Sequence, residues 1–118
     1  MDFNFTENQL DIIEMARELV KKDIAPNAVE HDKDHSFPEK EFELIREMGF
    51  SAIGIPEEYG GPGGCDLDRV LAIREIGKVD GSLATLLSVS SMMIHALEEF
   101  GTEEQKNKYF PLLAEQGY

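Results

Sequence analysis

The sequence predicts an all-α protein, an orthogonal or up-down bundle of about five helices with a Gly/Pro-rich turn region near residues 54–65. Three observations predict this class. Apolar residues recur at helical spacing, capping signals precede the periodic stretches, and no segment of useful length alternates apolar and polar residues as a half-buried strand would. Because the chain has 118 residues and no internal repeat, we expect a single domain spanning residues 1–118.

The first helix begins at a capping box formed by Thr6 and Gln9. Its apolar residues follow at helical spacing: Leu10, Ile13, Val20 and Ile24. Pro26 is expected to kink this helix, with a continuation as far as Asp32. Pro38 is well placed as the first residue of a second helix, which Gly49 ends.

The remaining helices follow the turn region. Asp66 is a plausible N-cap for the third helix, and residues 80–82 separate it from the fourth. The fourth helix, Ser82 to Phe100, is apolar nearly all round, which predicts a central helix surrounded by others. A second capping box, Thr102 to Gln105, begins the fifth helix, and Pro111 is expected to interrupt or kink it.

The formal charge of −13 excludes several kinds of partner. Nucleic acid and anionic membrane surfaces both require clustered Lys and Arg, so we expect neither. The longest uncharged stretch, Ser82 to Leu97, is too short and too polar to span a bilayer, and no signal or transit peptide is visible. The single Cys65 cannot form an intramolecular disulfide, which favours a reducing, cytoplasmic location.

Several local patterns invite chemistry but have simpler explanations. His31 and His35 flank carboxylates, yet the stretch lacks the Glu of a zincin helix and precedes Pro38, so we interpret it as a solvated connector without a metal. The glycines at 60–64 lack the Gly-Lys-Ser/Thr of a phosphate-binding loop. Ser residues of the fourth helix lack a nucleophile elbow, and so we interpret them as packing residues of a buried helix. Those serines are Ser82, Ser88, Ser90 and Ser91.

Thr85, Ser88 and Met92 are spaced three and four residues apart and therefore share one helix face. Small residues on an otherwise bulky helix leave a groove in which a slender apolar ligand could lie. Plain core packing is the alternative, and it is the more frequent meaning of such a pattern.

Two blocks carry a family resemblance. Residues 55–61 read Ile-Pro-Glu-Glu-Tyr-Gly-Gly, and residues 101–106 read Gly-Thr-Glu-Glu-Gln-Lys, followed by Tyr109 and Pro111. Their order and spacing, together with the opening helix and the Phe37-Pro38 helix start, resemble the N-terminal helical domain of the flavin-dependent acyl-CoA dehydrogenases.

The resemblance implies a homotetrameric enzyme that oxidises an acyl-CoA thioester to its trans-2-enoyl form. A carboxylate would remove the α-proton while the β-hydrogen passes as hydride to N5 of FAD, which then reduces an electron-transfer flavoprotein. The family's catalytic carboxylate and most flavin contacts lie in later domains, so no catalytic or cofactor-binding residue is expected here. The matching contribution of this region is one wall of the acyl-chain pocket, formed by Ala84, Thr85, Ser88 and Met92. The Ser-rich run at 88–91 is nearer to short-chain members of the family.

The chain ends at Tyr118, about where the family's β-rich flavin domain would begin. We therefore expect a fragment of a longer enzyme that is inactive alone and associates into dimers or larger species through apolar surfaces. The alternative is a stand-alone helical binding or scaffold module that kept the fold without the reaction.

Overall fold

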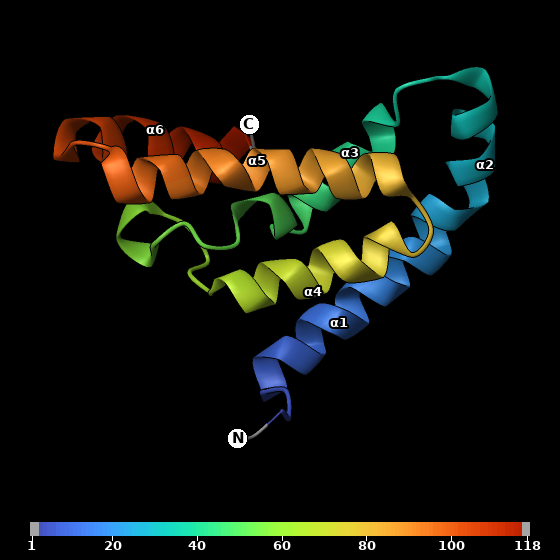
Figure 1. Cartoon of the computed structure of the whole chain (residues 1–118), viewed down its shortest axis with the longest axis horizontal. Helices are drawn as coiled ribbons and strands as arrows, with labels where there is room; N and C mark the ends of the chain where they lie inside the picture. The colour runs from blue at the N-terminus through green and yellow to red at the C-terminus, as the bar shows by residue number, and fades with distance from the viewer. Residues whose placement is uncertain (1–2, 117–118) are drawn as a thin grey trace.

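The fold is all-α, as the sequence predicted. The structure, a computed structural model, describes residues 3–116, and the sequence features at Gly117 and Tyr118 lie outside them. No strand occurs in residues 3–116 (Figure 1). The elements in chain order are α1 (Glu7–Leu19), the π-helical turn η1 (Val20–Ile24), α2 (Ala25–Asp34), α3 (Glu39–Glu47), the 3-10 turns η2 (Phe50–Ala52) and η3 (Glu57–Tyr59), α4 (Asp66–Gly77), α5 (Gly81–Phe100) and α6 (Glu103–Gln116).

The first predicted helix is one continuous helical run from Glu7 to Asp34 that changes its winding at η1. Its capping box is confirmed, because Thr6 Oγ1 accepts from the Gln9 amide and Gln9 Oε1 accepts from the Thr6 amide. At the position where Pro26 was expected to kink the helix, the backbone forms a widened π-helical turn, and the helix continues beyond it as predicted. Pro26 has no N–H to donate to the Lys22 carbonyl, and its ring would clash with that carbonyl in an ordinary α-turn.

Other predicted boundaries shift by one residue. Pro38 caps α3 instead of starting it, and Cys65 caps α4, where its amide donates to Asp68 Oδ2 at 2.9 Å. Gly49 follows α3 in the left-handed conformation, as predicted. Pro111 does not interrupt α6. Because Pro111 faces solvent, water can satisfy the Asn107 carbonyl that its missing N–H leaves free.

Helices α1, α4, α5 and α6 pack against one another in chain order. Helix α4 lies against both α1 and α5, and α6 folds back along the C-terminal half of α5 (Figure 1). Two hydrophobic clusters result. The larger contains Ala16, Leu19, Val20, Ile24, Ile45, Phe50, Ile53, Ala72, Ile76, Leu83 and Leu87. The smaller contains Ala52, Ile55, Ile94 and Phe110.

The Gly/Pro-rich region is an ordered turn anchored by a buried arginine. Gly54 N–H donates to the Gly63 carbonyl at 2.7 Å, and Gly63 N–H donates back to the Ile55 carbonyl at 2.9 Å. Arg69 of α4 is 5% exposed, and its Nε donates to the Ile53 carbonyl at 3.1 Å. The turn therefore closes against α4 through backbone groups that its glycines leave accessible.

The two sequence blocks that carry the family resemblance meet in space. The Tyr59 ring lies 5.0 Å from the Phe110 ring, and its hydroxyl donates to Glu103 Oε2 at 3.3 Å. The 3-10 turn η3 is thereby fixed to α6.

A buried carboxylate joins α1 to α4. Glu75 is 3% exposed and accepts from Arg17 Nε at 3.0 Å, Arg74 Nη2 at 2.8 Å and Lys78 Nζ at 2.7 Å. Burial opposes ionisation, but the hydrogen bonds from Lys78, Arg17 and Arg74 outweigh it and lower the pKa of Glu75 from 4.5 to about 2.

This depressed pKa predicts an acid-sensitive contribution to stability. A group with a lowered folded-state pKa stabilises the fold above pH 4.5 and loses that contribution as the pH falls towards 2. Because the three cations are about half exposed, we expect a contribution on the order of 1–2 kcal/mol. The free energies of unfolding of the wild type and of Glu75→Gln, measured in urea, should therefore converge as the pH falls from 4.5 towards 2. Parallel pH profiles would contradict the assignment.

Gly61 should be intolerant of a side chain. A Cβ there would lie 2.2 Å from the Ile55 carbonyl oxygen, so backbone must move to admit it. We expect Gly61→Ala to lower the free energy of unfolding, measured in urea, by on the order of 1–3 kcal/mol. Gly81→Ala is the matched control, since a Cβ there meets nothing within 4 Å, and a neutral or stabilising result is expected. Equal effects at both positions would show that the close approach is not the cause.

Candidate functional site

Helix α5 has one buried stripe and one open face. Asp80 caps it by accepting from the Leu83 amide at 2.9 Å. The buried residues follow at helical spacing: Leu83, Leu87, Ser91 and Ile94. The prediction of a central helix surrounded by others is therefore wrong for this chain. Helix α5 has more apolar residues than its buried stripe can hold, and the others are exposed in the described residues 3–116.

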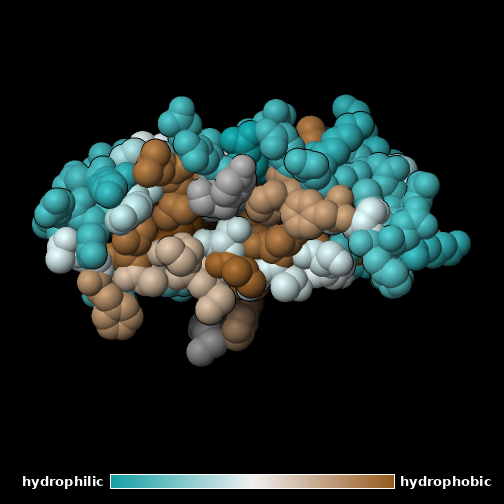
Figure 2. Space-filling view, turned by 90° about the horizontal axis from the view of Figure 1, so that it is seen from above, coloured by the Kyte–Doolittle hydropathy of each residue, from teal (hydrophilic) through white to brown (hydrophobic). Residues whose placement is uncertain are grey.

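The open face carries hydroxyl, thioether and aliphatic groups. Met92 is 64% exposed, Met93 and Val89 are each 55% exposed, and Phe100 is 86% exposed. Apolar side chains form a band along the long axis of the molecule when it is seen from above, with hydrophilic side chains at both ends (Figure 2). An exposed apolar surface of this kind marks a place where another molecule or another part of a protein binds.

Three of the four predicted pocket residues lie on this face. Thr85, Ser88 and Met92 are exposed, and Thr85 Oγ1 donates back to the Gly81 carbonyl at 2.8 Å, so its methyl group is the part available to a ligand. Ala84 is half-buried against α4, where a Cβ on Gly77 would lie 3.2 Å from its own. The structure thus brings three of the residues together and directs the fourth towards the core.

A cavity of about 630 Å³ lies beside the N-terminal end of this face. Thr85 and Leu86 of α5 form one side of it, and His31, His35 and Phe37 form the other. Its lining is mixed, with apolar groups from Phe37 and Leu86 beside the two imidazoles. It extends the open face of α5 towards α2.

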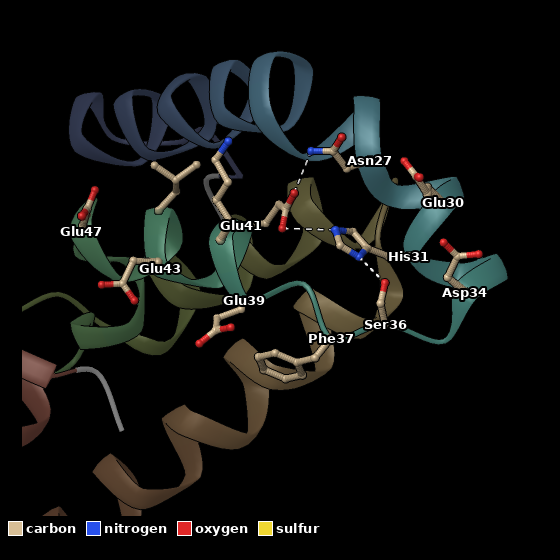
Figure 3. Close-up of a pocket in the computed structure, with 12 residues that line it drawn as sticks. Asn27, Glu30, His31, Asp34, Ser36, Phe37, Glu39, Glu41, Glu43 and Glu47 are labelled. Atoms are coloured by element: carbon tan, nitrogen blue, oxygen red, sulfur yellow. Dashed lines mark hydrogen bonds and ion pairs between the residues drawn. The ribbon is translucent and has the colours of Figure 1, made fainter.

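A second hollow of about 810 Å³ separates α2 from α3. Within it Glu41, which is 3% exposed, binds two residues of α2: Asn27 Nδ2 donates to Oε1 at 2.8 Å, and His31 Nε2 lies 3.3 Å from Oε2 (Figure 3). The other imidazole nitrogen lies 2.7 Å from Ser36 Oγ. Burial opposes ionisation of Glu41, but the hydrogen bonds from Asn27, its own amide and His31 hold the pKa of its carboxyl below the usual range.

The interpretation of residues 31–35 as a solvated connector is wrong in part. Residues 31–34 form the last turn of α2, and His35 ends it in the left-handed conformation at φ 52°. His31 is not solvated as a connector residue would be, since it is half-buried and contacts Ser36 Oγ and Glu41 Oε2. Among residues 3–116, no three or more His, Cys, Asp or Glu side chains are grouped as metal ligands.

Sequence reasoning missed Glu41 and Arg69 as buried polar groups. The spacing of Asn27 and His31, four residues apart on one helix face, was the available signal for a shared partner. Nothing local to Glu41 indicates that it is that partner. Glu57 and Glu58 of η3 are both exposed.

Substitutions on the two faces of α5 should differ sharply in cost. Leu87→Ala removes a fully buried side chain and should destabilise by about 2–5 kcal/mol. Ser88→Ala, on the next residue and the open face, should change stability by less than about 0.5 kcal/mol. Urea unfolding of the two variants measures this difference. A large cost at Ser88 would mean that the open face supports the fold.

Comparison with known proteins identifies relatives along nearly the whole chain. A family model for the acyl-CoA dehydrogenase N-terminal domain matches residues 6–117. The acryloyl-CoA reductase (NADH) of Anaerotignum propionicum is 38% identical over 99% of this chain and 30% of its own length. The short-chain-specific acyl-CoA dehydrogenase of Clostridium acetobutylicum is 37% identical over 97% of this chain and 30% of its own length.

Two solved structures share the fold. Butyryl-CoA dehydrogenase from Megasphaera elsdenii superimposes with a TM-score of 0.89 at 33% identity, covering 98% of this chain and 31% of that one. A structure from work on the electron transferring flavoprotein of Acidaminococcus fermentans and flavin-based electron bifurcation gives 0.92 at 43% identity, covering all of this chain and 31% of that one. The chain thus spans about 30% of the length of these relatives. No helix in residues 3–116 is both long enough and apolar enough to cross a membrane.

Proposed function

Because this chain belongs to the N-terminal domain family of the acyl-CoA dehydrogenases, we propose that it supplies one wall of the acyl-chain pocket in an FAD-dependent acyl-CoA dehydrogenase. The observation that carries the proposal is the open face of α5. Thr85, Ser88 and Met92 share that face, and an uncovered surface of small hydroxyl and thioether groups suits the packing of a slender alkyl chain. Ala84 would contribute from the edge of this wall.

The complete protein would remove hydrogens from the α and β carbons of an acyl-CoA thioester to give the 2-enoyl-CoA. FAD, when bound, would accept the β-hydrogen as hydride. The α5 segment does not fit the FAD diphosphate, since Gly81–Phe100 contains no Lys or Arg to pair with it. We therefore assign the FAD diphosphate to a site outside α5. By the family resemblance we assign the catalytic base and most flavin contacts to later domains, and so we expect this chain alone to be inactive.

Protein partners follow from the same proposal. The exposed apolar residues of α5 would be covered by the rest of the polypeptide and by further copies in a homo-oligomer. An electron-transfer flavoprotein would accept the electrons, which agrees with the subject of the work that produced one of the matching structures. Sedimentation of the isolated chain as a clean monomer, with no dye-accessible apolar surface, would favour a stand-alone binding module instead.

The reductive direction is a second candidate. The relative from Anaerotignum propionicum is an acryloyl-CoA reductase that uses NADH, and its identity extends over nearly all of this chain. Assay of the complete protein separates the two. Saturated acyl-CoA with an artificial electron acceptor tests oxidation, and NADH with a 2-enoyl-CoA tests reduction.

Enlarging Ser88 in the complete protein should shorten the accepted acyl chain. Ser88→Leu places extra carbon atoms on the proposed wall, and we expect kcat/KM to fall about tenfold for acyl chains that reach it, because one to two methylenes lose their burial. The shortest acyl-CoA should be unaffected. Glu98→Leu is the control, since Glu98 is exposed on another side of α5, beside Arg69, and its replacement should leave kcat/KM unchanged for every chain length. An equal loss for all chain lengths at Ser88 would argue against the wall.

A further inference from the structure

Helix α2 is attached to the fold differently from every other α-helix described in residues 3–116. None of residues 25–37 is buried, although Ile24 on one side and Pro38 on the other both are. The neighbouring helices α1, α3 and α4 each bury residues of their own. The segment therefore spans two fixed points without contributing a side chain to either hydrophobic cluster.

Polar contacts with one carboxylate take the place of that missing burial. Asn27 and His31 lie one turn apart on the face of α2 turned towards α3, and each binds a different oxygen of Glu41 (Figure 3). Ser36 holds the imidazole from the other side. These bonds can be lost without opening the apolar core, because Asn27 and His31 belong to neither hydrophobic cluster.

Hollows lie on both sides of the segment. His31 lines the cavity of about 810 Å³ facing α3, the cavity of about 630 Å³ facing α5, and a smaller one of about 220 Å³ near the Asp80 cap. Phe37 lines both of the larger cavities. A shift of α2 would therefore enlarge one of the two larger cavities and reduce the other.

Both ends of the segment have backbone that departs from the regular α-helix. The π-helical turn η1 precedes it, and His35 follows α2 in the left-handed conformation. Changes of winding of this type are common where helices bend during function. They would allow residues 25–37 to swing while Ile24 and Pro38 stay in place.

We propose that residues 25–37 form a lid over the cavity beside Thr85, with Glu41 as its latch through Asn27 and His31. Opening the lid lengthens the groove along α5, and closing it brings His31 and Phe37 against the groove's end. The lid is inferred from the contacts of Asn27 and His31 with Glu41 and from the two larger cavities. The ligand that it admits, the far end of an acyl chain, rests on the proposed function.

Hydrogen exchange of the full-length polypeptide, read by mass spectrometry, tests the lid without any ligand. In the wild type, peptides from residues 25–37 should exchange faster than those from 66–77 in α4. His31→Ala and Asn27→Ala each remove one bond to a buried carboxylate and should speed exchange in 25–37 by about tenfold while leaving 66–77 unchanged. Glu30→Ala, on the same helix and exposed beside the same hollow, is the control and should have no effect.

Two results would overturn the lid. One is wild-type exchange in 25–37 as slow as in α4, and the other is equal acceleration of all peptides in both latch variants, which would mean a purely structural role. In turnover assays Asn27→Ala, which lies outside the lining of the cavity beside Thr85, should lower KM for the longest acyl-CoA substrates several-fold relative to the wild type. Absence of all acyl-CoA turnover in the wild type would refute the proposed function, but the exchange result would still decide the lid.

Discussion

Burial of one stripe of α5 joins the two hydrophobic clusters of the molecule. Leu83 and Leu87 enter the larger hydrophobic cluster with α1 and α4, and Ile94 enters the smaller one with Phe110 of α6. The stripe also fixes the rotation of α5 about its own axis. With the buried side set by packing, the side that carries Thr85, Ser88 and Met92 must face outward. The candidate pocket wall is thus a consequence of how the core is formed.

Polar anchors place the remaining segments around this helix. Arg69 ties the glycine-rich turn to α4, Glu75 ties α1 to α4, and Glu41 ties α2 to α3. Each is buried, and each has its charge compensated by hydrogen bonds or ion pairs, as burial of a charge requires. The first two join elements that also share apolar contacts. Glu41 stands apart, since α2 has no buried residue to support it.

The helices, caps and turn region could be predicted from sequence because their causes are local. The capping boxes at Thr6 and Thr102 and the left-handed Gly49 depend on residues within four positions of each other. The π-helical winding of η1 was not predicted, because the missing N–H and the ring of Pro26 indicate a disturbed helix without specifying its form. The shared face of Thr85, Ser88 and Met92 followed from spacing. Its exposure, and the turn of Ala84 towards Gly77, depended on where α4 packs.

Photolabelling of the complete protein tests the central claim, that the open face of α5 receives the acyl chain. An acyl-CoA with a diazirine on its terminal carbons would be irradiated in the bound state, and the labelled residues identified by peptide mapping. The account predicts labels at Thr85, Ser88 or Met92, suppressed by an excess of unlabelled acyl-CoA. Specific labelling confined to residues outside α5 would contradict it.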